Sequence, residues 1–406
     1  MDYSRRQFLK STGLGLLAFG LPPAFLVRAA EAQQIAKGKV LVVVFQRGGM
    51  DGLNAVIPFK DRSYYSMRPS IAIAEPAAAE QTAVDLDGFY GLHPALSPLK
   101  AIYDKGHLAI VHAAGSPDNT RSHFDAQDYM EIGTPGIKNT PDGWLNRYLK
   151  QTARKESPFR GVAVTPQLPR MLAGGAPALT LSSIAEFRLR SEATAAQLRR
   201  LYASTPDPLF RVGGESLFAA MEELKRIESK IPPSKEIYPA GRFGAGLSNI
   251  ARLIRADAGL EIAFTEVEGW DTHVNQGGAT GQMANRLKVL ADGLAAFYRD
   301  LGDRLNDVVL ITMSEFGRTA RENGSRGTDH GHANVMFLLG GPVRGGKVYG
   351  RWPGLAPELL HEDRDLNLTT DFRAVCSEAI ARHLGQKDLS KIFPGYRSSA
   401  PLGLLV

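Results

Sequence analysis

Residues 39–46 read KVLVVVFQ, an almost unbroken run of apolar and mostly β-branched side chains. Such a run is typical of a strand that is buried on both faces of a parallel sheet. Similar runs occur at residues 107–114, 161–165, 260–267, 307–313 and 334–339. Helical periodicity appears between them, at residues 122–132, 192–202, 214–230, 247–256, 282–305 and 371–384. Strands that alternate with helices predict an α/β fold with a central, mostly parallel sheet and helices on both faces.

The composition is that of an ordinary globular protein. Of the 406 residues, 44% are hydrophobic and 22% are charged, which excludes a disordered chain. Cys376 is the only cysteine, so a disulfide scaffold is excluded as well. The formal net charge of +6 is modest and no long basic run is present, so nucleic acid is not an expected partner. We interpret the irregular residues 151–246 as an insertion or cap on one large domain.

The first thirty residues have the features of an export signal. Paired arginines at positions 5 and 6 precede Gln-Phe-Leu-Lys, an apolar stretch follows, and Ala-Glu-Ala at 30–32 offers a cleavage site. The paired arginines indicate the twin-arginine (Tat) route, the alternative being an uncleaved anchor. We therefore expect residues 1–32 to engage the Tat translocase. Residues 33–406 would then form a single mature domain in the periplasm or outside the cell, with no stable membrane span after cleavage.

Polar clusters lie at the ends of the predicted strands, where α/β sheets bind their ligands. They occupy residues 46–52 (QRGGMDG), 120–125 (TRSHFD), 269–273 (GWDTH), 314–319 (SEFGRT) and 328–332 (TDHGH). These clusters contain four histidines, each with an aspartate close by in sequence: His123, His273, His330 and His332. Carboxylates and neutral imidazoles are ligands of divalent metals. The clusters predict a site for one or more divalent metal ions, with Zn, Mn, Mg and Ca all open.

Each cluster taken alone has a second interpretation. Asp51 either binds a metal or stabilises its glycine-rich turn. Ser122 either attacks a substrate or caps the helix that follows it. Glu315 either binds a metal or neutralises Arg318. The arginines of the clusters are suited to bind an oxyanion through two N–H groups, or else form structural ion pairs: Arg47, Arg121 and Arg318.

Taken together and in this order, the motifs resemble the DUF1501 family. The segments that carry the resemblance are FQRGGMDGLN, SHFDAQ, GWDTH, MSEFGRT and TDHGH, within about residues 40–384. That family is placed by distant similarity in the alkaline phosphatase/sulfatase-like superfamily, which implies an alkaline phosphatase-like α/β fold. The resemblance further implies that Ser122, at a helix N-terminus, attacks a phosphate or sulfate ester. The metal ligands that it implies are Asp51, Asp271, His273, Glu315 and either His330 or His332.

The sequence departs from the superfamily pattern at several points, among them the short spacing between Asp271 and His273. Phe316 stands where a metal-binding histidine is expected, which makes His123 the candidate replacement. The C-x-P-x-R signature of cysteine-type sulfatases is absent. We expect an exported metal-dependent hydrolase of a phosphate or sulfate ester, small or polymeric, in which Arg121 or Arg318 steadies the transferred oxyanion. The alternative is a non-catalytic exported binding or envelope-assembly protein that retains the fold.

Overall fold

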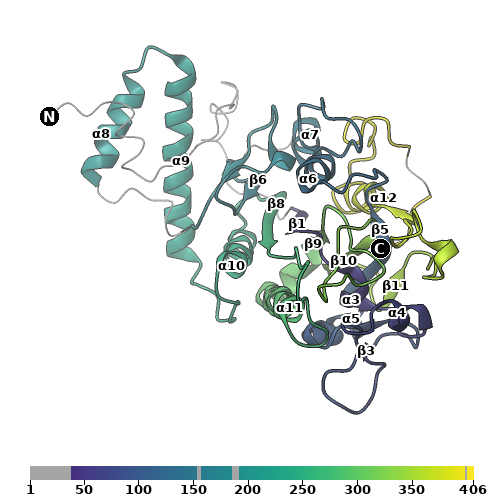
Figure 1. The fold of residues 1–406 in the computed structure, drawn as a ribbon. Helices are drawn as coiled ribbons and strands as arrows, with labels where there is room; N and C mark the ends of the chain where they lie inside the picture. Colours follow the sequence, from purple (N-terminus) through teal and green to yellow (C-terminus); the bar gives the residue numbers. More distant parts are fainter. Residues whose placement is uncertain (1–37, 153–156, 185–191, 398–399) are drawn as a thin grey trace.

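The structure, a computed structural model, describes residues 38–152, 157–184, 192–397 and 400–406. The predicted signal, residues 1–32, lies outside these residues. The central feature is a nine-stranded sheet with helices on both faces (Figure 1). The strands follow the order β11-β5-β10-β9-β1-β8-β6-β7, and β12 pairs with β5. The predicted α/β architecture is therefore confirmed.

The KVLVVVFQ segment forms the middle of this sheet. It becomes β1 (Val40–Arg47), which pairs in parallel with β8 (Ile262–Glu268) and β9 (Val308–Met313). The remaining strands are β5 (Leu108–Gly115), β6 (Gly161–Ala163), β7 (Leu179–Thr180), β10 (Asn334–Gly340), β11 (Lys347–Tyr349) and β12 (Thr370–Asp371). Among the described strands of this sheet, β10 alone runs antiparallel to its neighbours, β5 and β9.

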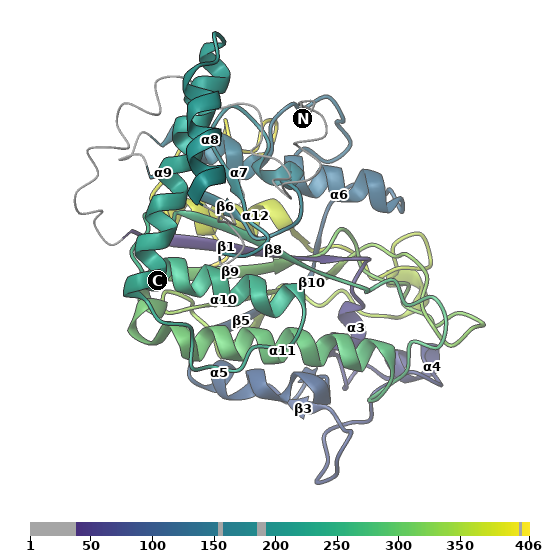
Figure 2. The same ribbon diagram turned by 90° about the vertical axis from the view of Figure 1, so that its left-hand side faces the viewer.

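Two apolar layers cover the sheet because successive side chains of a strand point to opposite faces. In β1, Val40, Val42 and Val44 belong to one buried cluster, whereas Leu41, Val43 and Phe45 belong to the other. The first layer is completed by η2 (Pro94–Leu99), α5 (Lys100–Asp104), α10 (Arg242–Arg255) and α11 (Gln282–Leu301). The second layer is completed by α6 (His123–Ile132), α7 (Trp144–Gln151) and α12 (Phe372–Glu378). Figure 2 shows the sheet between the layers.

The irregular segment at residues 151–246 divides between two roles. Its strands β6 and β7 extend the edge of the central sheet. Its helices α8 (Glu192–Ala203) and α9 (Pro208–Lys230) stand as a pair that projects away from the sheet (Figures 1 and 2). The apolar side chains of Ala220, Leu224 and Ile227 nevertheless join the same buried cluster as α10, so α9 is anchored to the body of the molecule.

Smaller elements fill the region after β1. A three-stranded sheet is formed by β2 (Val56–Ile57), β3 (Val84–Asp85) and β4 (Gly91–Leu92), beside α3 (Gly52–Ala55) and α4 (Arg62–Met67). The helical segment after α11 continues as η4 (Gly302–Asp307), and α12 continues as a π-helical turn over Ala379–His383. Short turns of 3-10 helix occur at Arg170–Leu172 and Pro357–Leu359. Within the described residues, no helix combines the length and the hydropathy that a membrane span needs.

The antiparallel direction of β10 decides where the polar clusters meet. Strands β1, β5, β8 and β9 deliver the segments that follow them to one edge of the sheet. Because β10 runs the other way, its amino end lies at that same edge, and the segment before it arrives there too. All five polar clusters predicted from the sequence are thus carried to one edge of the sheet.

Candidate metal centre

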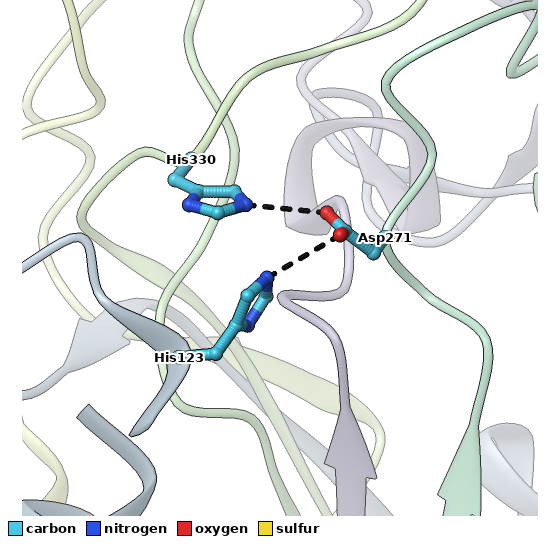
Figure 3. A group of neighbouring side chains, drawn as sticks. All are labelled: His123, Asp271 and His330. Carbon is cyan, nitrogen blue, oxygen red and sulfur yellow. Dashed lines mark hydrogen bonds and ion pairs between the residues drawn. The ribbon is translucent and has the colours of Figure 1, made fainter. Parts of the chain in front are cut away.

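Three side chains from three separate segments of the chain meet at this edge. His123 is the first residue of α6, Asp271 follows β8, and His330 precedes β10 (Figure 3). Each offers a ligand atom, and these atoms all lie within 4.8 Å of one another. The side chain of Asp271 is 45% exposed, so the group is open to solvent. It is an accessible set of two imidazoles and one carboxylate.

The carboxylate of Asp271 lies at the middle of the group. Its Oδ1 is 3.2 Å from His330 Nε2, and its Oδ2 is 3.5 Å from His123 Nε2. His273 adds a third imidazole, because its Nε2 lies 2.9 Å from Asp271 Oδ1 and 3.0 Å from His330 Nε2. Four side chains therefore direct potential ligand atoms towards one small volume.

Hydrogen bonds on the far side of each ring fix which nitrogen faces that volume. The Nδ1 of His123 lies 2.8 Å from Glu315 Oε1, and that of His273 lies 2.9 Å from Asp329 Oδ1. The Nδ1 of His330 lies 2.8 Å from the backbone carbonyl oxygen of Arg121. Because carboxylates and carbonyls only accept, each Nδ1 carries the proton and donates it. In the neutral form of each ring, Nε2 then carries the lone pair and faces the carboxylate.

Imidazole lone pairs that face a carboxylate are satisfied by a positive charge placed between them. The lack of a partner is clearest at His123 Nε2, which is buried and makes no hydrogen bond among the described residues. A divalent ion would satisfy all of these atoms at once. Histidines that bind metals typically donate their second N–H to a carboxylate or a carbonyl. The group therefore fits a divalent metal in both its first contacts and the contacts behind them.

Glycine 48 brings the loops after β1 and β8 close enough to build the site. Its φ of +119° is a conformation that side chains disfavour, and a Cβ there would lie 2.8 Å from the backbone nitrogen of Asp271. Its N–H donates to Glu315 Oε1 at 2.8 Å. The QRGGMDG segment thus serves as a close-packed backbone support for Asp271 and Glu315.

Glu315 lies behind His123. It is buried, and its carboxylate accepts hydrogen bonds from His123, Gly48, Gln127 and Ser314. Burial raises its pKa, but the hydrogen bonds from His123 and Gln127 outweigh burial and leave the pKa below its ordinary value. The ionised carboxylate orients His123, and the same hydrogen bond raises the pKa of that imidazole.

The other groups at the centre also have shifted pKa values. Burial lowers the pKa of His330, which favours its neutral form. Burial acts to raise the pKa of Asp271, yet the hydrogen bond and charge of Arg318, followed by the nearby histidines, bring it below its ordinary value. The pKa of Asp329 is lowered in the same way, because the hydrogen bond from His273 outweighs burial. The acidic groups of the site are therefore ionised at neutral pH.

Besides Glu315, two more predicted ligands lie outside the group. Asp51 is buried, and its Oδ2 accepts from Arg68 Nη1 and Gln276 Nε2, both at 2.7 Å. Its Oδ1 caps α3 by accepting from the N–H of Asn54 at 3.4 Å. His332 is buried, stacks on the ring of His361 with centroids 4.2 Å apart, and has its pKa lowered by burial to about 4.

The predicted nucleophile and arginines are placed as follows. Ser122 is the N-cap of α6, and its Oγ accepts from the N–H of Asp125 at a long 3.5 Å. The guanidinium of Arg121 pairs with Glu362 at 2.6 Å and with Asp365 at 2.7 Å. Arg318 is buried and donates to Asp271 at 2.6 Å. It also donates to four backbone carbonyls, those of Gly48, Gly49, Trp270 and Thr328.

The sequence did not show which group lies behind each imidazole. Asp329 adjoins His330 in the chain, but the structure pairs it with His273. Gln127, one helical turn after His123, bonds to Glu315 and was not singled out. Its signal was the spacing of four residues from His123, which places both side chains on one face of α6.

Comparisons with known proteins give one family and several loosely similar structures. A family model described as "Protein of unknown function (DUF1501)" matches residues 38–392. The curated proteins contain no match. Solved structures that resemble the chain include the lipoteichoic acid synthase LtaP from Listeria monocytogenes, with a TM-score of 0.39 and 10% identity over 91% of this chain and 76% of that chain.

Two further structures have similar scores. The C-terminal periplasmic domain of EcEptC from Escherichia coli, in complex with Zn, has a TM-score of 0.35 and 8% identity over 75% of this chain and 73% of that chain. A protein in the alkaline phosphatase superfamily from Vibrio parahaemolyticus has a TM-score of 0.33 and 10% identity over 86% of this chain and 71% of that chain. Superpositions this loose carry no argument about function, which has to come from the chain's own residues.

Proposed function

The chain belongs to the DUF1501 family of proteins of unknown function, and we propose that it is a metal-dependent hydrolase of phosphate or sulfate esters. One observation carries the proposal: the imidazoles of His123, His273 and His330 turn their Nε2 atoms towards the carboxylate of Asp271, with every Nδ1 held from behind. Three imidazoles and one carboxylate suit zinc better than magnesium or calcium, which prefer oxygen ligands.

A metal held at this centre would supply positive charge to polarise the ester and to stabilise the charge that develops on its oxygens. The metal would be held by His123, Asp271 and His330, with His273 as the fourth side chain. Glu315, Asp329 and the carbonyl of Arg121 keep the three rings in the orientation that binding needs. The exposure of Asp271 leaves a side on which the ester can approach.

Ser122 is our candidate for the nucleophile. It directly precedes His123 and caps α6, where free backbone N–H groups and the partial charge of the helix favour an anionic group. The 3.5 Å bond from its Oγ to the N–H of Asp125 is long, so the hydroxyl is released at little cost.

Arg121 is better placed than Arg318 to steady the transferred oxyanion. Arg318 is buried, and every one of its guanidinium nitrogens already donates to the protein. Arg121 is 28% exposed, and its Nη1 makes no hydrogen bond among the described residues. A guanidinium with a free N–H can bind a phosphoryl or sulfuryl oxygen.

We also propose that residues 1–32 are a cleaved Tat signal, so that the mature chain acts in the periplasm or outside the cell after transport by the Tat translocase. The support is the paired arginines, the short apolar stretch and the Ala-Glu-Ala at residues 30–32. The unidentified ester would then be met outside the cytoplasm.

The pairing of Asp51 with Arg68 favours a second candidate function. With Asp51 engaged by a guanidinium, the described residues provide one metal centre and no second one beside it. A single centre can bind a metal or a metal-bound ligand without turnover. The second candidate is therefore a non-catalytic exported protein that binds a ligand or assists envelope assembly.

The test is metal content together with ester turnover. We expect purified exported protein to hold about one zinc per chain by elemental analysis and to hydrolyse p-nitrophenyl phosphate or p-nitrophenyl sulfate. His123→Ala should lose the metal, because it removes a ligand. Ser122→Ala should keep the metal and lose at least a thousand-fold in kcat/KM, because it removes the nucleophile.

His107→Ala is the matched control, since His107 is a half-buried histidine that contacts Tyr298 and lies outside the group. It should keep both metal and turnover. Protein that binds no zinc, manganese, magnesium or calcium, and stays inactive when each is supplied, would contradict the proposal. Stoichiometric metal without turnover of either ester would favour the binding protein.

A further inference from the structure

Phe124 is exposed at the rim of the metal centre. Its side chain is 90% exposed, although it directly follows His123. The backbone that carries it lies in the first turn of α6, where the N–H of Ala126 donates to the carbonyl of Ser122 at 2.9 Å. A phenyl ring left in water forgoes a large part of the free energy that burial would provide.

Two other exposed apolar side chains are tied to the same place. Val274, 54% exposed, directly follows His273, and its carbonyl accepts from Gln282 Nε2 at 2.9 Å. Ile137 is 50% exposed and precedes Lys138, whose ammonium group pairs with Asp125 at 2.7 Å, beside Phe124. Single exposed apolar side chains are ordinary, but two that directly follow histidines of one site, with a third linked to them through the Lys138–Asp125 pair, indicate a binding surface.

This grouping is selective within the described part of the chain. The other large apolar side chains with high exposure there are Leu201, Ile237, Leu359 and Val406. Phe124 and Val274 directly follow two histidines that contact different oxygens of Asp271. An ester bound at Asp271 therefore lies next to both backbone segments that carry these exposed apolar side chains.

The carboxylates beside these apolar groups already have partners. Asp125 forms an ion pair with Lys138, and Asp329 accepts a hydrogen bond from His273. The rim thus offers apolar contact and no carboxylate without a partner from these residues, which favours an uncharged group on the substrate. A phenyl ring on a fixed helix suits a flat partner, since flat faces stack on it with the largest contact area.

From this geometry we propose that Phe124 determines substrate specificity, forming with Val274 and Ile137 an apolar rim that binds the alcohol part of the ester. The inference rests on the proposed function. The substrate class that it names is an ester whose alcohol presents a flat apolar face next to the ester oxygen. An aromatic ring and the C–H face of a sugar ring both have this chemistry. Small polar alkyl esters lack it.

Binding of non-hydrolysable phosphonates to the zinc-loaded full chain tests the rim directly. The probes are methylphosphonate, phenylphosphonate and the phosphonate analogue of glucose 1-phosphate, measured by calorimetry. We expect the wild type to bind phenylphosphonate or the sugar analogue at least about ten-fold more tightly than methylphosphonate, as burial of one ring face implies. Phe124→Ala should reduce that ratio below about three-fold and leave methylphosphonate binding unchanged. Phe124→Tyr, which keeps an aromatic ring, should keep the ratio of the wild type.

Ile237→Ala is the matched control, because Ile237 is 88% exposed and lies between α9 and α10. It should leave every dissociation constant unchanged. If phenylphosphonate is the probe whose affinity depends on Phe124, the substrate is an aryl ester. If it is the sugar analogue, the substrate is a sugar ester. Equal binding of all three probes by the wild type, or a ratio unaffected by Phe124→Ala, would overturn the inference.

The two proposals fail in different ways. If the protein hydrolyses esters and Phe124 contributes nothing to binding, the apolar-rim proposal is wrong and the hydrolase proposal stands. If ring compounds bind in a way that depends on Phe124 but no ester is hydrolysed, the apolar-rim proposal stands and the hydrolase proposal is wrong. Zinc-loaded protein that binds none of the probes would overturn both, and would make a protein partner the next occupant to consider for the exposed ring.

Discussion

At the scale of single residues, the orientation of His123 depends on Glu315. Glu315→Gln replaces one carboxylate oxygen by an NH₂ group among donors from His123, Gly48 and Gln127. The imidazole then loses its charged acceptor. We expect the affinity for zinc to fall about ten- to hundred-fold, and the free energy of unfolding to fall by about 2 kcal/mol because buried donors lose a partner.

Competition with a chromophoric chelator at neutral pH measures the affinity, and urea unfolding measures the stability. Glu322→Gln is the control, since Glu322 is another carboxylate acceptor but bonds to Ser70 at the surface. It should change zinc affinity by less than two-fold. Unchanged affinity in Glu315→Gln would show that Glu315 does not orient a metal ligand.

Residue by residue, the sequence indicated which groups meet but not which face the centre. The clusters that hold His123, Asp271 and His330 were recognisable because each lies at the end of a predicted strand. Glu315 is also a carboxylate at the end of a predicted strand, yet it lies behind the imidazole of His123. Whether a carboxylate faces the centre or lies behind a ligand depends on side-chain packing. Asp51 is paired with an arginine seventeen positions away, across α3 and α4, and no local pattern predicts that contact. The ligand roles themselves stay predictions.

At the scale of elements, a close contact between two loops sets the position of His330. The N–H of Gly317 donates to the carbonyl of His332 at 2.8 Å, and the N–H of Gly331 donates to the carbonyl of Gly317 at 2.9 Å. A Cβ on Gly317 would lie 1.9 Å from the carbonyl oxygen of Ala333. We expect Gly317→Ala to lower the free energy of unfolding by about 1–3 kcal/mol, as overpacking does, and to weaken zinc binding.

Gly324→Ala is the control within the same connection, because a Cβ there meets nothing within 4 Å. It should shift stability by less than about 0.5 kcal/mol and leave the metal affinity unchanged. Urea unfolding and zinc titration of both variants give the comparison. If Gly317→Ala matched Gly324→Ala in both measurements, the loop contact would not position His330.

The long elements were predictable and the short or reversed ones were not. Six strands and six helices appear close to their predicted positions, because the strands lie in apolar runs of the sequence and the helices are long enough to show their period. The run NVMFLL of β10 has the same composition as the parallel strands, so its antiparallel direction was not visible. Direction is set by the connection, and β7 and β12, with two residues each, are too short to show any period.

At the scale of the whole molecule, buried histidines make stability depend on pH. His112 lies within β5, and its ring nitrogens bond to Val56 and Ala113; His383 lies after α12 and bonds to the carbonyl of Val40. Burial lowers the pKa of each to about 4. The unfolded chain binds a proton near pH 6.5, whereas the folded protein resists it until about pH 4.

The stability that these neutral rings contribute is therefore present above pH 6.5 and is lost as the pH falls towards 4. Each ring accounts for up to about 3 kcal/mol over this window. We expect the free energy of unfolding of the metal-free chain to fall steeply between pH 6.5 and 4.5 and to be nearly flat just above pH 7. Unfolding in urea with EDTA present measures it without a contribution from metal release.

His112→Asn separates this effect from the titration of carboxylates. The substitution destabilises the protein at every pH, because it removes a well-packed ring. The informative quantity is the slope of the free energy of unfolding against pH. In His112→Asn this slope should decrease by up to about 1.4 kcal/mol per pH unit, the value for one proton. A pH profile parallel to that of the wild type would mean that the folded protein accepts a proton at His112 as readily as the unfolded chain does. The fold would then tolerate charge inside the sheet layer that β5 occupies, contrary to its burial.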